Sequence, residues 1–326
     1  MDLFVMDSER QIRQRVRSFS MDLAFGADEN DFSLEVHEPC SIGAGCYVFV
    51  PGTEYGGVVT KLKPTRNAAG EAVSYEGQTW HGILNNHVIT PDSGVAHYEP
   101  SGDADSVMGT LISRLGIGDL FETYQTAGVD VTGAFRYAPA YDGICNMLRK
   151  AGYRLSVRFG LKSRKCSLHA VPVRDFGDVS GVSGHTPYSA TLDYRPFNHI
   201  IALGKGEGKD RTVVNLYADE SGNISKTQTL TGLSERAYVY DERSAEAEEL
   251  EDKARDKLAS IRGTNKVDID LKYQSGISVG DSVTVVSAFA GIKTTSTVGK
   301  LVVSVKNGRC SVTPSFATSK VLEDYD

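Results

Sequence analysis

Five cysteines and seven histidines are the side chains of this chain best suited to nucleophilic chemistry. A cysteine nucleophile needs a base such as histidine within hydrogen-bonding reach. Cys46 lies in a predicted strand next to those that hold His37 and His81, so a cysteine–histidine pair is conceivable. A buried cysteine otherwise behaves as a small hydrophobic side chain. We favour this structural interpretation for all five cysteines, which are Cys40, Cys46, Cys145, Cys166 and Cys310.

Metal-binding patterns are weak. Five residues separate Cys40 from Cys46, and five separate His81 from His87, but neither pair lies on one rigid predicted element. The H-E-x-x-H pattern of metalloproteases is absent. We therefore expect no metal ion and no cofactor, and we assign no catalytic, cofactor-binding or metal-ligating residue.

Two glycine-containing stretches resemble catalytic or phosphate-binding loops. Gly181–His185 reads G-V-S-G-H, which lacks the spacing of a nucleophile elbow. Gly204–Gly208 reads G-K-G-E-G after an apolar strand, but a phosphate-binding loop must be followed by a helix. Residues 211–218 have the pattern of a strand instead. The sequence therefore predicts a hairpin turn at Gly204–Gly208.

Acidic and aromatic residues leave two other functions open. Paired carboxylates carry out glycoside hydrolysis, and acids such as Asp175 or Asp193 could serve a hydrolase, but nothing distinguishes them. Trp80, the only tryptophan, and the 15 tyrosines could stack on sugars of a host receptor. Aromatic residues within strands more often form the core or cross-strand pairs.

The net charge of −7 argues against a surface that binds duplex DNA, because phosphates are neutralised by clustered lysine and arginine. A basic cluster at 158–165 is interpreted as a solvated strand and turn. No apolar run is long enough for a membrane-spanning helix, and the first residues lack the pattern of a signal peptide. We therefore expect free thiols and synthesis in the bacterial cytoplasm.

The periodicity predicts a mainly β fold with an α+β insertion. We expect two β-barrel-like domains, at 1–97 and 191–326, separated by a small α+β domain at 98–190. In the first, alternation at 32–36 and apolar residues at 58–62 predict strands, 67–70 predicts a hairpin tip, and 73–84 continues the sheet with Trp80 inside it.

The middle and last regions contain the predicted helices. Apolar residues at helical spacing predict helices at 104–115 and from about 141 to 152, and 153–159 alternates as a strand whose hairpin partner is 165–173. Further strands are expected at 199–203, 211–218, 267–273, 282–287, 295–305 and 309–316. The last domain includes the longest predicted helix, 241–261.

The order of several stretches resembles the baseplate hub, or tail-associated, proteins of long-tailed bacteriophages and prophages. The stretches are G-Q-T-W-H-G-I-L at 77–84, the helix at 104–115, the helix and strand at 141–159, F-N-H-I-I-A-L-G at 197–204, the acidic helix before V-D-I-D-L at 267–271, and V-G-D-S-V-T-V at 279–285. The similarity covers about residues 1–318. Each stretch alone is weak, and their order carries the resemblance.

The resemblance implies a virion structural protein rather than an enzyme. In this family three copies close into a ring, and two similar barrels in each copy present a pseudo-sixfold surface to a hexameric tail tube. The expected partners are therefore further copies in a homotrimer, the distal tail protein, tail tube subunits and the tape measure protein. DNA would pass without sequence-specific binding, no membrane anchor is expected, and the expected location is the tail tip of the virion. The alternatives are a tail-associated cell-wall hydrolase or peptidase, and a module that binds a host receptor or glycan.

Overall fold

Two compact units make up the chain. The computed structural model describes residues 1–27, 29–67, 70–123, 126–178, 188–191, 195–243, 245–262, 266–269, 276–287, 292–306 and 308–322. Unit 1 comprises Met1–Pro187, Asp270–Val286 and Thr297–Ala317, and unit 2 comprises Tyr188–Ile269, Ser287–Ser296 and Thr318–Asp326. The division into domains at 1–97, 98–190 and 191–326 stays a prediction.

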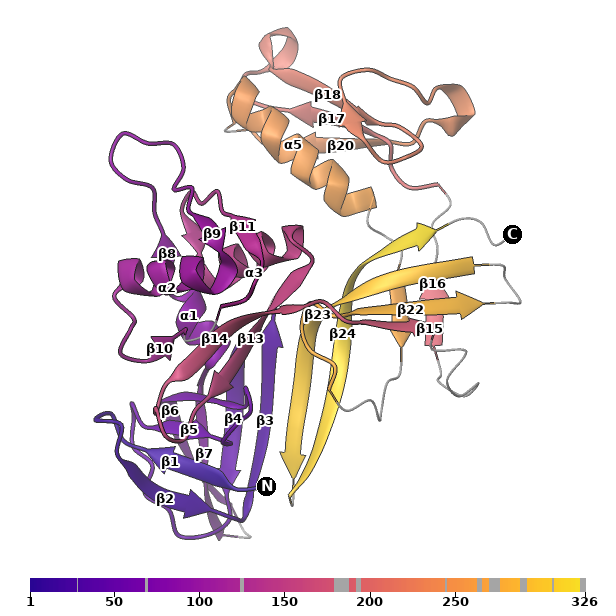
Figure 1. Cartoon of the computed structure of the whole chain (residues 1–326). Helices are drawn as coiled ribbons and strands as arrows, with labels where there is room; N and C mark the ends of the chain where they lie inside the picture. The colour runs from indigo at the N-terminus through magenta and orange to yellow at the C-terminus, as the bar shows by residue number, and fades with distance from the viewer. Residues whose placement is uncertain are drawn as a thin grey trace. The chain divides into compact units, whose positions relative to one another are not determined.

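A large sheet, most of which belongs to unit 1, joins strands from the beginning of the chain to strands near its end (Figure 1). Its strands are β1 (Leu3–Met6), β2 (Ile12–Val16), β3 (Phe19–Gly26), β4 (Asp31–Val36), β5 (Tyr47–Phe49), β6 (Gly56–Asn67), β7 (Gly70–Thr79), β15 (Asp175–Asp178), β22 (Ser282–Ser287), β23 (Ile292–Lys306) and β24 (Arg309–Leu322). β3 pairs with β4 on one side, where Leu23 lies opposite Phe32. On its other side β3 pairs with β23, where Leu23 lies opposite Val303.

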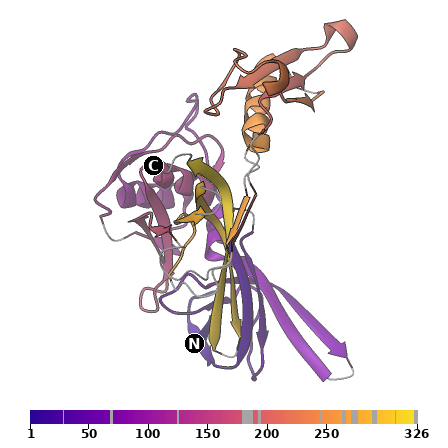
Figure 2. The same cartoon turned by 90° about the vertical axis from the view of Figure 1, so that its right-hand side faces the viewer.

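The strands predicted from alternation are confirmed in β4 and β6. Phe32 and Leu34 are buried, while Asp31, Ser33 and Glu35 between them are exposed, because successive side chains of a strand point to opposite faces. β6 and β7 form the predicted hairpin, with Asn67 opposite Gly70. Figure 2 shows this hairpin extending well beyond the neighbouring strands.

An α+β segment lies between β7 and β15, and it begins before residue 98. Its elements are α1 (Trp80–Asn85), β8 (Val88–Ile89), β9 (Ser101–Asp103), α2 (Ala104–Leu115), β10 (Phe121–Glu122), β11 (Asp130–Thr132), β12 (Ala138–Pro139), α3 (Ala140–Lys150), β13 (Tyr153–Phe159) and β14 (Cys166–Pro172). α2 begins after Asp103, whose side chain accepts from the backbone N–H groups of Asp105 and Ser106, and it ends at the left-handed Gly116. Both predicted helices and the 153–159 hairpin are confirmed.

The prediction that the sheet continues through 73–84 is wrong after Thr79. Thr79 caps α1 by accepting from the backbone N–H of Gly82, and Trp80 begins the helix rather than lying in a strand. The ring of Trp80 stacks on Phe159 of β13, with ring centroids 4.9 Å apart, and it also stacks on Tyr47. The short helix thereby brings its tryptophan into the core that the α+β segment shares with β1 and β5.

Unit 2 contains a small sheet covered by one helix. Its elements are β16 (Tyr188–Thr191), β17 (His199–Leu203), the 3₁₀ turns η1 (Gly208–Asp210) and η2 (Gly232–Ser234), β18 (Val213–Ala218), β19 (Ile224–Ser225), β20 (Ala237–Asp241), α5 (Ala247–Arg262) and β21 (Lys266–Ile269). Leu250, Ala254 and Leu258 of α5 are fully buried against β17 and β18. The helix predicted at 241–261 therefore starts later than expected, because Asp241 still belongs to β20.

The mainly β character is confirmed, but two barrels are not. In unit 1 the described strands form an open path from β15 to β2, and in unit 2 the order β19–β18–β17–β20 is also open. The described strands therefore close neither sheet into a barrel. The buried helix stripe explains the difference in unit 2, since α5 covers one face of the open, four-stranded sheet.

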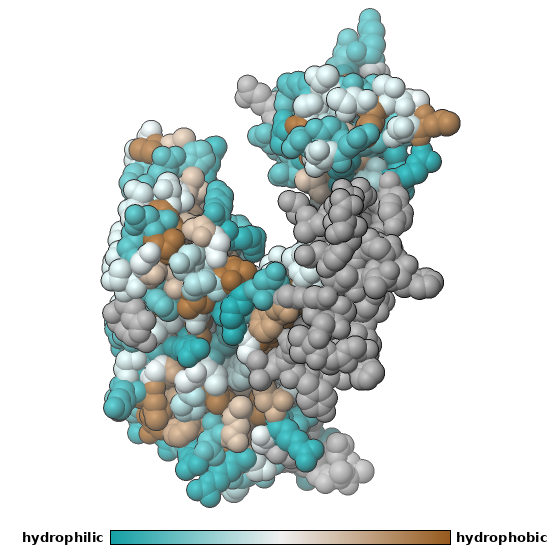
Figure 3. Space-filling view, turned by 45° about the vertical axis from the view of Figure 1, so that its right-hand side comes forward, coloured by the Kyte–Doolittle hydropathy of each residue, from teal (hydrophilic) through white to brown (hydrophobic). Residues whose placement is uncertain are grey.

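The surface of both units mixes polar and apolar side chains. Figure 3 shows hydrophobic residues in small groups among hydrophilic ones on the face that it displays. None of the helices in the described ranges is long and apolar enough to cross a membrane.

Candidate functional site

The strongest polar cluster of unit 1 is built around Asp281, which is fully buried immediately before β22. It follows Gly280, whose φ of +91° lies in the region that glycine tolerates and other residues rarely adopt. The Asp281 backbone N–H donates to the carbonyl of Ser278 at 3.1 Å, and its carbonyl accepts from the N–H of Val298 at 2.8 Å. The tight turn and β23 therefore hold this carboxylate in place.

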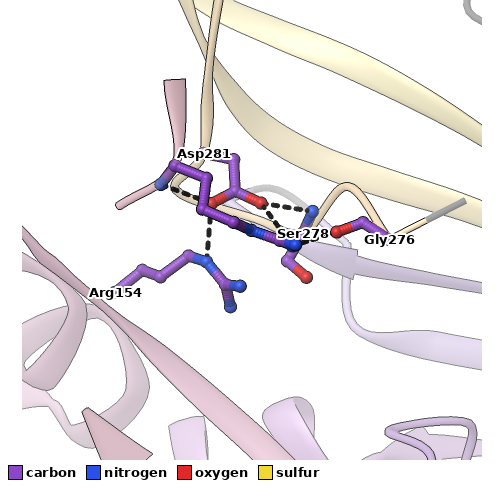
Figure 4. A network of polar contacts seen from close by, with 5 residues as sticks. Arg154, Gly276, Ser278 and Asp281 are labelled. Atoms are coloured by element: carbon purple, nitrogen blue, oxygen red, sulfur yellow. Dashed lines mark hydrogen bonds and ion pairs between the residues drawn. The ribbon is translucent and has the colours of Figure 1, made fainter. Parts of the chain in front are cut away.

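Four hydrogen bonds reach the Asp281 carboxylate (Figure 4). Oδ1 accepts from Nε of Arg154 at 2.7 Å and from the backbone N–H of Arg174 at 3.0 Å. Oδ2 accepts from the backbone N–H of Ser278 at 2.9 Å and from Nη2 of Arg174 at 3.3 Å. Nη2 of Arg174 also donates to the carbonyl of Gly276.

These contacts make Asp281 a joint between distant parts of the sequence. Arg154 lies on β13 and Arg174 lies between β14 and β15, so one carboxylate holds the α+β segment against the turn that opens β22. A buried carboxylate is tolerated only when it is paired and hydrogen-bonded, and all four contacts meet that need. Each oxygen of this carboxylate thus accepts two hydrogen bonds from the protein itself.

A second buried carboxylate joins α2 to β14. Asp105 is 1% exposed, its Oδ1 accepts from the backbone N–H of Ala170 at 2.8 Å, and its Oδ2 lies 2.5 Å from Nδ1 of His169. Next to it, Asp103 caps α2 and also accepts from the N–H groups of Ala127 and Gly128. Asp103 and Asp105 thus hold the backbone of neighbouring segments in place.

Four of the five cysteines have thiol pKa values raised by burial. Burial raises the pKa of the Cys145 thiol to about 12, and burial raises the pKa of Cys166 well above its usual range. The thiolate is the reactive form, so these shifts disfavour the nucleophilic form of both side chains at neutral pH. Burial likewise raises the pKa values of Cys40 and Cys310.

The histidines weighed as partners of Cys46 are engaged elsewhere. His37 lies 3.1 Å from the hydroxyl of Ser20. His81 is buried, stacks on Phe25 with ring centroids 4.4 Å apart, and has Nε2 at 3.5 Å from Glu54. Among the residues that the structure describes, no hydrogen bond joins Cys46 to a histidine, and no three histidine, cysteine or acidic side chains gather as metal ligands.

The loop Gly204–Gly208 is the predicted hairpin connection. The N–H of Gly204 donates to the carbonyl of Thr212, and the N–H of Thr212 donates to the carbonyl of Lys205, both at 2.8 Å. The side chain of Lys205 pairs with Glu246. The stretch that follows in the sequence is η1 and then strand β18, so no α-helix directly follows this loop as a phosphate-binding loop requires.

The remaining candidates divide into buried and undescribed residues. Trp80 is 0% exposed and packed between aromatic rings, which removes it as a sugar-stacking surface. Asp175 accepts from the hydroxyl of Thr284 at 3.4 Å within the paired strands β15 and β22. Gly181–His185 and Asp193 lie outside the described residues.

Sequence reasoning missed the role of Asp281, although it singled out the stretch 279–285. The available signal was a Gly-Asp pair directly before an alternating strand, which predicts a tight turn. Nothing local indicates that the carboxylate meets arginines more than one hundred residues earlier in the chain.

Comparisons with solved structures agree with the arrangement of these elements. A tail protein from Neisseria meningitidis MC58 matches with a TM-score of 0.51 and 13% identity, covering 97% of this chain and 96% of that one. The prophage tail protein gp18 from Listeria monocytogenes matches with a TM-score of 0.51 and 13% identity, covering 97% and 94%. The 43 kDa tail protein of prophage MuSo2 from Shewanella oneidensis matches with a TM-score of 0.52 and 10% identity, covering 97% and 96%.

Comparisons of sequence find no relative of this chain. No family model matches the chain, and no curated protein matches it. At identities of 10–13% the structural likeness concerns the fold, and it extends over nearly the whole chain. The chain therefore has the fold of bacteriophage and prophage tail proteins, as the order of its sequence motifs indicated.

Proposed function

We propose that this protein is a structural component of a phage or prophage tail, located at the tail tip of the virion. The observation that carries the proposal is the fold likeness to three tail proteins over 97% of the chain. A likeness of such extent includes both the β-rich part and the α+β segment, so it does not rest on one common β motif.

The finer proposal is a baseplate hub that closes as a homotrimer. Each copy would contribute two β-rich lobes to the ring, with domain limits near 97 and 190, and tail tube subunits, the distal tail protein and the tape measure protein would contact it. DNA would pass through the ring without sequence-specific contacts. The open strand path of unit 1 supports the proposal, because unpaired strand edges are surfaces on which neighbouring chains add strands.

We further propose a non-catalytic role. Two cysteines have thiol pKa values raised by burial, and the two buried aspartates of unit 1 are engaged by backbone N–H groups and by arginine or histidine side chains. Trp80, Asp105 and Asp281 are therefore used for packing and for joining segments of the chain. This supports the structural role over both alternatives.

The test is the mass of the purified protein in solution. Mass photometry at nanomolar concentration and sedimentation at micromolar concentration should both detect a species with three times the mass of one chain. Incubation with purified bacterial cell walls should release no soluble fragments. A monomer at every concentration would overturn the hub proposal, and cell-wall release would overturn the non-catalytic one.

A further inference from the structure

An open cavity of about 640 Å³ lies in unit 1 beside the Asp281 joint, and three arginines line it. These are Arg154, Arg158 and Arg174, and Glu54 is the only acidic residue among the described lining residues. Asp281 and Glu54 together offset two of these three positive charges, so the lining keeps an excess of one positive charge in a chain whose net charge is −7. Local excess of one charge within a concave, low-dielectric site focuses attraction toward a small ion of the opposite sign.

The side chain of Arg154 is fixed in a position from which it can bind such an ion. Its side chain is 11% exposed, and its Nε is fixed by Asp281 at 2.7 Å. Figure 4 shows its two terminal nitrogens turned away from Asp281. No described residue accepts a hydrogen bond from those nitrogens. An arginine fixed through Nε presents a rigid pair of donors, which matches the two oxygens of an oxyanion.

The other two arginines extend the basic wall. Arg158 lies four residues after Arg154 on the same face of β13, and its side chain is exposed. It has no partner among the described residues. Arg174 is half exposed, with Nη2 shared between Asp281 and the carbonyl of Gly276. Ser156 and Ser278 add small polar groups between the arginines.

The rest of the lining is apolar. Tyr55, Val171, Pro172, Ile277 and Val312 form this part of the wall. Apolar side chains beside fixed arginines suit a carboxylate that is carried on a hydrocarbon stem. They suit the backbone of a nucleic acid less well, because phosphates are bound along extended basic tracks and this chain is acidic as a whole.

We propose that this cavity binds an acidic peptide segment of a partner protein, with a glutamate or aspartate carboxylate on the terminal nitrogens of Arg154 and with Arg158 completing the site. The apolar wall receives the neighbouring side chain of that segment. The inference concerns unit 1 alone and does not depend on the trimer proposed above.

The test uses the full-length protein and a fluorescein-labelled peptide, Ala-Leu-Asp-Glu-Val-Ala, blocked at both ends. The control peptide carries Gln and Asn in place of the two acids. Fluorescence anisotropy should show binding of the acidic peptide only. Arg158→Glu should weaken that binding about tenfold or more, since a charge-assisted hydrogen bond is replaced by repulsion. Arg158→Gln should weaken it less.

Arg66→Glu is the matched control, because it makes the same charge change at an exposed residue of the β6–β7 hairpin, outside the cavity. Its affinity for the peptide should stay within about twofold of the unmodified protein. Equal binding of the neutral peptide, or equal losses in the two Glu variants, would overturn the proposal. Displacement of the peptide by millimolar inorganic phosphate at constant ionic strength would also overturn it, since the site would then accept any oxyanion.

Discussion

Nε of Arg154 lies 2.7 Å from Oδ1 of Asp281, although the two residues are 127 positions apart in the sequence. Arg154 belongs to the α+β segment. Asp281 directly precedes β22, the first of the C-terminal strands in the large sheet that also contains β3. The pair therefore closes a long loop of chain at a buried point. Much of unit 1 depends on that closure, because the same carboxylate also holds Arg174 and Ser278.

Asp281→Ala is expected to lower the free energy of unfolding of unit 1 by about 3–5 kcal/mol, because a buried arginine loses its counter-charge. Two backbone N–H groups lose their acceptors as well. Urea unfolding followed by circular dichroism gives the value. Asp92→Ala is the control, since Asp92 forms an ion pair with Arg114 but its side chain is 65% exposed. That change should lower the free energy of unfolding by at most about 1 kcal/mol. Equal effects of the two substitutions would refute the role of Asp281 in joining the two segments.

Asp103→Ala is expected to destabilise the protein by about 1–2 kcal/mol through loss of the α2 cap. The pKa of Asp103 lies below its usual value. Burial would raise it, but the N–H groups of Gly128, Ser106, Ala127 and Asp105 outweigh that effect.

A carboxyl with a lowered folded pKa contributes stability above its unfolded pKa of about 3.9, and this contribution is lost as the pH falls through the folded pKa. The difference between the unmodified protein and Asp103→Ala in urea unfolding should therefore narrow below about pH 4. A difference that stays constant down to pH 2 would show that the charge of Asp103 is unimportant.

Asp31→Asn should raise the stability at neutral pH, whereas Asp103→Ala should lower it. Partial burial raises the pKa of Asp31, and the nearby Glu29 and Glu76 raise it further. Such a group favours the folded state below its unfolded pKa, and this contribution disappears as the pH rises through the folded pKa. The substitution should therefore stabilise the protein at pH 7 by a few tenths of a kcal/mol, about the size of exposed charge effects. The gain should vanish at pH 3 in the same unfolding assay, and a loss of stability at pH 7 would contradict the assignment.

Trp80 tests the core of the α+β segment. Trp80→Ala should cost about 3–5 kcal/mol, because it leaves a cavity beside Phe159 and Tyr47. Trp80→Phe should cost clearly less, since it keeps an aromatic ring and removes an indole N–H that has no acceptor among the described residues. Thermal unfolding would rank the two variants. Similar losses for both would mean that the indole N–H is satisfied in solution.

Local patterns predicted the elements whose signals lie within a few residues. Asp103 and Gly116 bracket α2 as cap residues should, and the alternation of 153–159 produced β13 as expected. Trp80 was misplaced because the short apolar run W-H-G-I-L fits a strand as well as a helix, and the capping role of Thr79 was overlooked. The start of α5 was misjudged because acidic residues follow Asp241 directly and look helical.

Long-range relationships were beyond local patterns. The pairing of β3 with β23 brings Leu23 opposite Val303, and no periodicity of either strand specifies that partner. The two barrels were inferred from strand spacing alone, but spacing does not determine whether the edge strands of a sheet meet. The same limit applies to Asp281, whose arginine partners are set by the folding of the whole α+β segment.

Electron microscopy of the purified full-length protein tests the central claim most directly. If the chain is a tail-tip hub, class averages should show annular particles with threefold symmetry and an open centre. Single, compact particles without a central opening, in preparations concentrated enough for association, would contradict the account.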